Sequence, residues 1–269
     1  MKVLTWDEFR SGPVASSIAA VIGVFDGLHI GHRELIRKIL GRSGLLSMVL
    51  TFEENPKRIL SPANYHGELS TQDQKLSLID SMGVDLCVLI DFSGDFSKLP
   101  GRKFLSMLSE RGELRFLAVG SDFRCGYRLD TDAQAMREFF QESSIKVDLL
   151  SAVYWAGHPV SSSRIRKAII AGHLEDAAQM LGRPYEIDLR GAGVLASQRI
   201  VPTGGQVSPP PGLYESQVSY NDGSRGLDSL TLAVALDTDG GWSVPLKSFP
   251  QARASVLIGL SLIRMVSRE

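Results

Sequence analysis

The sequence has little net charge, few cysteines and no long apolar run, and each shortage excludes a class of protein. Lys and Arg total 29 against 30 Asp and Glu, a formal net charge of -1 at pH 7. No global basic field is therefore available to attract nucleic acid or anionic lipid. No apolar run approaches the roughly 18 residues that span a bilayer, and the first residues lack the basic-then-apolar pattern of a signal peptide. We expect a cytoplasmic protein whose anion sites are local.

The two cysteines are far apart and in different settings. Cys87 lies in an apolar run and Cys125 in a loop next to glycine. They form no CxxC pair and no metal-ligand cluster, and we expect no disulfide in a cytosolic chain. With 269 residues and 43% hydrophobic residues, the chain is long enough for two domains with real cores.

The first two thirds of the chain alternate short apolar runs with amphipathic stretches, which indicates strand–helix–strand units. Strands are predicted at residues 18–25, 45–52, 84–92, 114–119 and 145–150. Helices are predicted at residues 30–40, 71–82, 102–110, 132–142, 162–171 and 174–181. Such units build an α/β, Rossmann-like domain with a parallel sheet, in which ligands bind beyond the carboxyl ends of the strands.

Pro184 marks the expected boundary between two domains. Beyond it, glycine- and proline-rich turns separate short apolar runs such as 214–220 and 230–236. That rhythm is typical of a small all-β domain, a sandwich or a barrel. We therefore predict domains at residues 1–184 and 185–269.

The most informative stretch reads GVFDGLHIGH at residues 23–32, where a buried strand turns through glycine into a helix. His29 and His32 flank Gly31 at the start of that helix. Imidazole donors would face the same place as the free backbone N–H groups of the first turn, which suits a polyphosphate. The alternative is that both histidines are surface residues near a turn.

Four segments of the sequence, in order, resemble the motifs of one family. They read GVFDGLHIGH, then TFEENP at residues 51–56, VGSDFRCG at residues 119–126, and SSSRIR at residues 161–166 followed by LGRPY at residues 181–185. Together they resemble the bacterial bifunctional riboflavin kinase/FMN adenylyltransferases, or FAD synthetases, of the HxGH nucleotidyltransferase superfamily. The chain departs from the motifs at Glu54 and Asn55, where proline and histidine are usual, and at Cys125, where phenylalanine is usual.

The resemblance implies an FMN adenylyltransferase that uses Mg-ATP and FMN, with Mg²⁺ as cofactor. It implies catalysis by His29, His32 and Arg166. It implies ATP binding by Gly23, Phe25, Asp26, Gly31, Ser162, Ser163 and Arg164. It implies flavin binding by Asn55, Asp122, Phe123, Arg124 and Arg128, and magnesium contacts from Asp26 and Asp122. Local alternatives stay open, since serine is a common helix cap, an Asp-Gly pair is a common turn, and an Asp-Phe-Arg loop can be a surface ion pair.

The second domain resembles the family's riboflavin kinase barrel but lacks two residues on which kinase chemistry depends. The stretch 201–205 reads VPTGG, so glycines Gly204 and Gly205 stand where the PTAN motif has alanine and a ligand asparagine. Leu232 stands where the family has a glutamate base, and leucine cannot accept a proton. We therefore predict a monofunctional enzyme that has lost its kinase activity.

Three other functions remain open at this point. One is a bifunctional enzyme with residual kinase activity. Another is an HxGH transferase for pantetheine phosphate or nicotinamide mononucleotide, which the DFR loop and the barrel-like tail disfavour. The third is a non-catalytic protein that binds flavin nucleotides. The expected partners are small molecules, ATP and FMN with FAD as product, and neither nucleic acid nor membrane; no protein partner can be inferred.

Overall fold

The computed structural model describes residues 1–12, 16–110, 113–190, 192–194, 199–221, 227–245 and 256–268. The chain forms two compact units. Unit 1 contains Met1–Tyr65 and Lys75–Pro159, and unit 2 contains His66–Gln74 and Val160–Glu269. The division into compact units therefore falls at Val160, and one earlier segment belongs to unit 2. The domain boundary predicted at residue 184 is a different division, and it stays a prediction.

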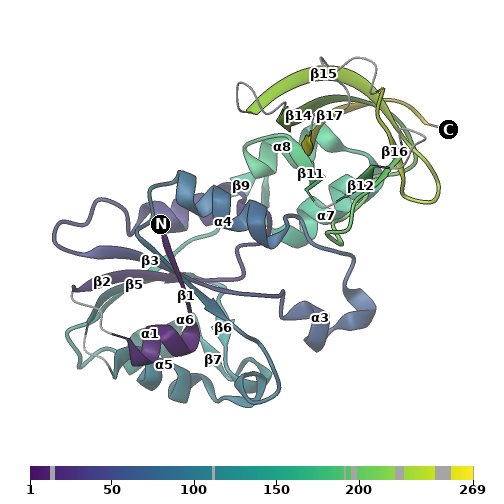
Figure 1. Cartoon of the computed structure of the whole chain (residues 1–269). Helices are drawn as coiled ribbons and strands as arrows, with labels where there is room; N and C mark the ends of the chain where they lie inside the picture. Colours follow the sequence, from purple (N-terminus) through teal and green to yellow (C-terminus); the bar gives the residue numbers. More distant parts are fainter. Residues whose placement is uncertain are drawn as a thin grey trace. The chain divides into compact units, whose positions relative to one another are not determined.

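Unit 1 is built on a six-stranded parallel sheet with strand order β1-β4-β3-β2-β5-β8 (Figure 1). The strands are β1 (Lys2–Thr5), β2 (Ile18–Ile22), β3 (Leu46–Phe52), β4 (Leu86–Ile90), β5 (Leu114–Gly120) and β8 (Lys146–Leu150). The central strand β2 is completely buried. Because β3, β2 and β5 are neighbours and parallel, the loops that follow them begin at the same edge of the sheet.

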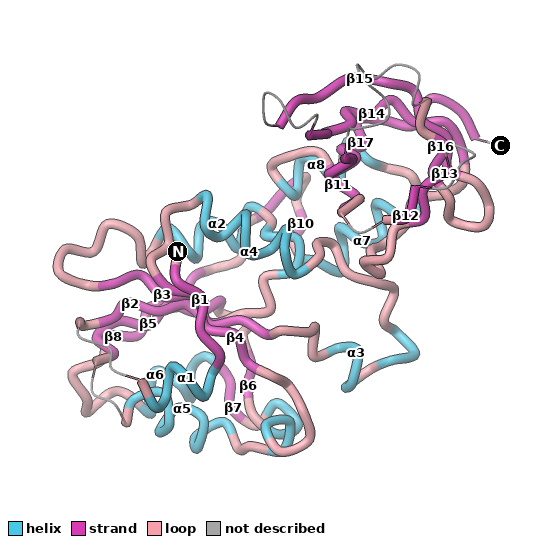
Figure 2. Tube along the Cα trace, viewed as in Figure 1, coloured by secondary structure: helices cyan, strands magenta, loops and turns pink. Residues whose placement is uncertain are grey.

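Helices cover both faces of this sheet, with α1, α5 and α6 on one side and α2 and α4 on the other (Figure 2). The helices of unit 1 are α1 (Trp6–Ser11), α2 (Ile30–Arg37), α3 (Lys57–Leu60), α4 (Gln72–Ser81, beginning in unit 2), α5 (Gly101–Ser109) and α6 (Ala133–Phe139). Residues of β2 alternate between the two cores: Ile18, Ala20 and Ile22 face the first group of helices, and Ala19 and Val21 face the second. This is the period-2 pattern of a strand buried on both faces.

Short elements complete unit 1. They are the 3₁₀ turns η1 (Asp26–Leu28), η2 (Pro62–Asn64), η3 (Phe96–Lys98) and η4 (Tyr127–Leu129), and the paired strands β6 (Arg124–Cys125) with β7 (Thr131–Asp132) and β9 (Tyr154–Trp155) with β10 (His158–Pro159).

Unit 2 joins two helices to a seven-stranded sheet with strand order β11-β17-β14-β15-β16-β13-β12, which curves as a half-barrel (Figure 1). The helices are α7 (Ser162–Ala171) and α8 (Leu174–Leu181). The strands are β11 (Tyr185–Asp188), β12 (Gly193–Val194), β13 (Arg199–Val201), β14 (Gly212–Asn221), β15 (Leu227–Leu236), β16 (Trp242–Ser243) and β17 (Val256–Arg268). Along β14, Tyr214, Ser216, Val218 and Tyr220 are buried and their neighbours less so, so one face carries the core.

The predicted fold class, a Rossmann-like parallel sheet followed by a small all-β part, is confirmed. The five predicted strands of unit 1 and the predicted helices are present, with ends that differ by up to a few residues. Strand β1 and helix α1 were missed; a capping box, in which Thr5 Oγ1 accepts from the Glu8 N–H and the Glu8 carboxylate from the Thr5 N–H, starts α1. The predicted strand 18–25 ends at Ile22, because the backbone turns at residues 23–28. No helix in the described part of the chain is long and apolar enough to cross a membrane.

A single hydroxyl links the end of β3 to the loop after β2. Thr51 is completely buried and its Oγ1 donates to the carbonyl of Val24 over 3.0 Å. We expect Thr51→Val, which keeps the shape and removes the donor, to destabilise unit 1 by about 1–2 kcal/mol. Native-state hydrogen exchange of the β2 and β3 amides measures this loss. The same change at the exposed Thr231 of β15 should leave those amides unaffected; equal protection in Thr51→Val and the parent would contradict the prediction.

Candidate functional site

The loop after β2 is a strained turn anchored by two buried side chains. Phe25 and Leu28 have φ angles of 52° and 38°, and Gly27 has a φ of 74°. L-residues rarely adopt left-handed backbone, and such strain persists only where the surrounding packing imposes it. Phe25 and Leu28 are 0% and 1% exposed and pack in the core between the sheet and α2. Asp26, also buried, lies on this turn. Their burial sets the direction in which the chain enters α2.

The two histidines meet at the first turn of α2. His29 is the N-cap, and its Nδ1 accepts a hydrogen bond from the backbone N–H of His32 over 3.3 Å. The two rings stack, with centroids 3.6 Å apart and planes 16° apart. The edge of Phe25 contacts His32, with centroids 5.2 Å apart. Since Nδ1 of His29 is an acceptor, its ring proton lies on Nε2, which can donate to a ligand.

Two glycines make room for this arrangement. A Cβ at Gly31 would lie 3.3 Å from Cε1 and Nδ1 of His29, and a Cβ at Gly23 would lie 3.0 Å from the Phe25 ring. Such distances are tighter than ordinary contacts, so a side chain at either position would displace an aromatic ring. Both glycines predicted for nucleotide binding therefore have a steric role in keeping the turn closed over Phe25 and His29.

His32 is held in its neutral form. Burial, and then the neighbouring His29, lower the pKa of His32 well below its usual value of 6.5. Within the described part of the chain, its buried Nδ1 has no hydrogen-bond partner. A polar atom buried in this way is unusual, because most find a partner in the protein or in water. Burial disfavours the second ring proton of His32, and an approaching anion would favour it. His29 and His32 together therefore suit a negatively charged ligand.

The loop after β3 carries Asn55, which is buried. Its Oδ1 accepts from the backbone N–H of Lys57, the first residue of α3, over 3.1 Å. Lys75 of α4, which sequence reasoning missed, is also buried and its Nζ donates to the carbonyl of Phe52, the last residue of β3, over 2.6 Å. Its only signal in the sequence is a lysine on the apolar side of a predicted helix, which is usually a solvated residue.

The loop after β5 places its charged residues at the surface. Asp122, Arg124 and Arg128 are exposed, whereas Phe123 packs against the core. Arg124 lies in β6, opposite Asp132 in β7. Arg128 has a φ of 54°, and its guanidinium lies 5.2 Å from the centroid of the Tyr127 ring. The exposed cations Arg124 and Arg128 and the half-buried ring of Phe123 are groups that an anionic, aromatic ligand would contact.

A partly buried contact that the sequence did not reveal holds this loop in place. Asp130 Oδ1 accepts from the backbone N–H of Gly101, at the start of α5, over 3.0 Å and from Thr131 Oγ1 over 2.9 Å. A Cβ at Gly126 would lie 2.2 Å from that carboxylate oxygen, so only glycine fits there. Burial, and then Asp130, raise the pKa of the nearby Cys125 thiol to about 12, which makes it a poor nucleophile.

The serine-rich segment of unit 2 starts α7, and Ser161 is its cap. Ser161 Oγ accepts from the backbone N–H of Arg164 over 3.3 Å. Ser162 and Ser163 therefore lie in the first turn rather than at the cap position. Arg166 is 6% exposed and its Nε donates to the carbonyl of Gly67 over 2.8 Å. Its Nη2 lies 3.9 Å from a carboxylate oxygen of Glu68.

Three positions of unit 2 depart from the kinase motifs, and the structure shows what surrounds each of them. Leu232 lies directly opposite Ser216, a completely buried residue whose Oγ has no partner within the described part of the chain. A Cβ at Gly204 would lie 2.6 Å from Thr71 Cγ2, so the alanine of the family motif does not fit here. Gly205 has a φ of 60°, and a Cβ there would meet nothing within 4 Å.

The structure thus brings His29, His32, Gly31 and Phe25 together, and it places the Asn55 and Asp122 loops after the two strands that flank β2. Ser162, Ser163, Arg164 and Arg166 belong to unit 2. In the described part of the chain, no three His, Cys, Asp or Glu side chains group as metal ligands. Asp26 and Asp122 would therefore fit magnesium only beside substrate phosphates, which is the usual way in which Mg²⁺ binds with nucleotides.

Comparison with known proteins identifies relatives of the chain. The family model described as FAD synthetase matches residues 13–164. A bifunctional riboflavin kinase/FMN adenylyltransferase from Escherichia coli (strain K12) is 30% identical over 208 residues, which are 73% of this chain and 66% of that protein. The corresponding Buchnera aphidicola protein (subsp. Schizaphis graminum) is 31% identical over 182 residues, 66% of this chain and 58% of that protein. The matches thus span under two thirds of the length of both bifunctional relatives.

A shorter relative and a solved structure agree with this picture. A protein named FAD synthetase from Listeria monocytogenes is 25% identical over 209 residues, 76% of this chain and 83% of that protein. A solved structure described as a macrolide-efflux protein from Streptococcus pneumoniae has a TM-score of 0.81 at 21% identity and covers 100% of this chain and 92% of that chain. At that identity it supports the fold alone.

The lowered pKa of His32 makes stability depend on pH. Below pH 6.5 the unfolded chain binds a proton at His32 that the folded chain does not, so the free energy of unfolding falls as the pH falls from 7.5 to 5.5. We expect His32→Gln to reduce that fall, as measured by urea unfolding at both pH values. In NMR, the His32 ring protons should not titrate between pH 8 and 6 in the free protein; a midpoint near 6.5 would contradict this.

Proposed function

The chain belongs to the FAD synthetase family, and on that premise we propose that it transfers the adenylyl group of Mg-ATP to FMN. An oxygen of the FMN phosphate attacks the α-phosphorus of ATP in line, and the bond from the α-phosphorus to the bridging oxygen breaks. FAD and pyrophosphate are the products. The observation that carries the proposal is the stacked pair His29 and His32 at the start of α2, at the carboxyl end of the central strand.

Such a reaction needs positioning and charge neutralisation rather than a covalent nucleophile. The Nε2–H of His29 and the backbone N–H groups of Ile30 and Gly31 at the start of α2 are donors for phosphate oxygens. His32, neutral in the free protein, would gain a proton as phosphate charge approaches it. Asp26 and Asp122 would hold a magnesium ion together with the ATP phosphates, and the ion would supply neutralisation of the phosphate charge.

We assign the flavin nucleotide to the loops after β3 and β5. Arg124 and Arg128 are exposed cations that suit the FMN phosphate, Phe123 offers an aromatic edge, and Asp122 begins the loop. Asn55 contributes less, because its Oδ1 already accepts from the Lys57 N–H. Its amide keeps a donor, but it lacks the charge of the histidine usual in the family.

On unit 2, we assign ATP to the first turn of α7. Ser161 caps the helix, and Ser162 and Ser163 follow it in the first turn, where hydroxyl groups suit phosphate oxygens. Arg164 lies in the same turn. Arg166 is the buried cation of this group, and its hydrogen bond to Gly67 sets its orientation.

We further propose that riboflavin kinase activity has been lost, so that the protein is a monofunctional adenylyltransferase. We also propose that it is cytoplasmic. Leu232 offers no base, and Ser216 opposite it has a buried hydroxyl without a partner among the described residues, as expected where a polar neighbour has been replaced by an apolar one. Gly205 has no side chain for a metal. The second candidate is a bifunctional enzyme, which the names of the Escherichia coli and Buchnera relatives favour.

Removal of the imidazoles should abolish most of the rate without unfolding the protein. His29→Asn keeps a side chain that caps α2 and removes the Nε2–H donor, and His32→Gln removes the second ring. Each should lower kcat for FAD formation by about 10²–10³-fold, as loss of one preorganised donor does. His158→Asn, at an exposed histidine of β10, is the control and should keep the parent rate. Near-normal rates in both site variants would contradict the catalytic role proposed for His29 and His32.

A chromatographic assay with Mg-ATP separates the remaining functions. We expect FAD from FMN and no product from riboflavin, because the residues that would phosphorylate riboflavin are absent. FMN or FAD from riboflavin would show a working kinase and favour the bifunctional enzyme. Binding of FMN without release of pyrophosphate would favour a non-catalytic flavin-binding protein.

A further inference from the structure

The segment His66–Gln74, here called the strap, belongs to unit 2 although it lies far from the rest of unit 2 in sequence. Its Glu68 N–H donates to the carbonyl of Gly205 over 3.1 Å, and its Glu68 carbonyl accepts from the Val207 N–H over 2.9 Å. Gly67 has a φ of 96°, and a Cβ there would lie 2.8 Å from the Gly205 oxygen. The strap and residues 205–207 therefore pair backbone to backbone, as a short parallel bridge.

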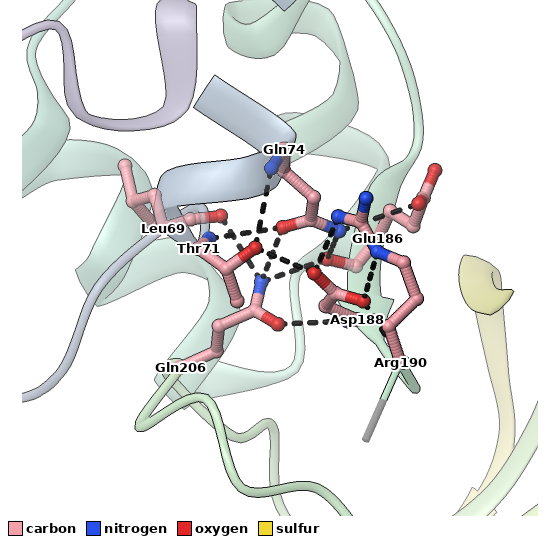
Figure 3. Close-up of polar contacts among 7 residues, drawn as sticks. All are labelled: Leu69, Thr71, Gln74, Glu186, Asp188, Arg190 and Gln206. Atoms are coloured by element: carbon pink, nitrogen blue, oxygen red, sulfur yellow. Dashed lines mark hydrogen bonds and ion pairs between the residues drawn. The ribbon is translucent and has the colours of Figure 1, made fainter. Parts of the chain in front are cut away.

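A partly buried polar cluster holds the other end of the strap, and Gln206 is its centre (Figure 3). Gln206 Nε2 donates to the Glu186 carbonyl over 2.9 Å and to Gln74 Oε1 over 3.1 Å. Gln206 Oε1 accepts from the Asp188 N–H over 2.7 Å. Both ends of one amide are thus satisfied by partners from the strap and from β11, which makes replacement by an apolar side chain expensive.

Asp188 adds a second tie to the strap (Figure 3). Thr71 Oγ1 donates to Asp188 Oδ2 over 2.5 Å, and Arg190 binds both carboxylate oxygens, over 2.6 and 2.9 Å. Burial alone would raise the pKa of Asp188, but the hydrogen bonds from Arg190 and Thr71 outweigh burial and hold that pKa below its usual value. The carboxylate therefore stays charged while it holds the strap.

The strap in turn holds Arg166. The two contacts of Arg166 described above, Nε to the Gly67 carbonyl and Nη2 beside the Glu68 carboxylate, both come from the strap. A guanidinium is planar and its donors have fixed directions, so the hydrogen bond at Nε restricts the plane of the group, and the nearby Glu68 carboxylate attracts its Nη2 end. Residues of β11 and the loop at Gln206 hold the strap, and the strap supplies both of these partners of Arg166.

We propose that Glu68 is a positioning residue for Arg166 in ATP binding, and that the polar cluster around Gln206 keeps Glu68 in place. This rests on the proposed function, in which Arg166 contacts ATP. Unit 2 then contributes to adenylyl transfer by orienting Arg166, although its riboflavin kinase activity is proposed to be lost. Binding energy is lost when such a group is misplaced, even where the charge itself remains.

The test is a double-mutant cycle with Glu68→Ala and Arg166→Met, which keeps the length of the buried stem. Glu68→Ala should raise KM for ATP about tenfold, the size of a typical pairwise coupling, and leave KM for FMN unchanged. In the Arg166→Met background it should have no further effect. The matched control is Glu215→Ala, which removes an ion pair with Arg264 on the outside of the same unit and should change neither KM.

A second arm tests the cluster. Gln206→Leu should raise KM for ATP severalfold and increase hydrogen exchange at residues 66–74, and Gln217→Leu, at an exposed amide bonded to Ser229, should do neither. Direct binding of Mg-ATP, measured by calorimetry, should follow the same order as KM. This second readout does not depend on turnover.

The outcomes separate the two proposals. If the parent protein makes FAD and Arg166→Met impairs ATP binding, but Glu68→Ala only lowers Tm or adds to Arg166→Met, the positioning role is overturned and the function stands. If Arg166→Met binds ATP normally, its assignment and the positioning role both fall. If the parent neither binds Mg-ATP nor makes FAD, the proposed function fails and the inference with it.

Discussion

The parallel pairing of β2 with β3 and β5 is the constraint on which the rest of unit 1 depends. Because these strands run in one direction, the loops that carry His29, Asn55 and Asp122 all begin at one edge of the sheet. Alternating burial along β2 assigns its residues to two cores, and a slip of one residue would exchange those cores. The register that stabilises the sheet therefore also sets where each of the three loops starts.

Local strain and electrostatics at the α2 start are consequences of that packing. The left-handed backbone at Phe25 and Leu28 is unfavourable alone, and burial of both side chains in the core offsets it. The same turn presents His29 as a cap and places the half-buried His32 ring beside it in its neutral form. Within the described part of the chain the Nδ1 of His32 is buried without a partner, so an anion that approached it would favour protonation of the ring.

Unit 2 contains a polar cluster beside the positions where the sequence departs from the kinase motif. Gln206 follows Gly204 and Gly205 directly and is the centre of this partly buried cluster. Such a network is costly to break, since each lost partner leaves a polar atom that is poorly solvated. That cost favours the pairing of residues 66–74 with the half-barrel.

Short-range patterns were sufficient for much of this protein. Short apolar runs of strand length indicated the strands, and glycine and serine signals indicated the start of α2 and of α7. The spacing of His29 and His32 indicated that both lie at the start of one helix. Nothing local indicates that Asp130 holds the start of α5, that Lys75 binds the end of β3, or that the segment 66–74 joins unit 2. Those contacts join residues 23 to 137 positions apart in the chain, and only the packed tertiary structure decides which distant partners a buried polar group meets.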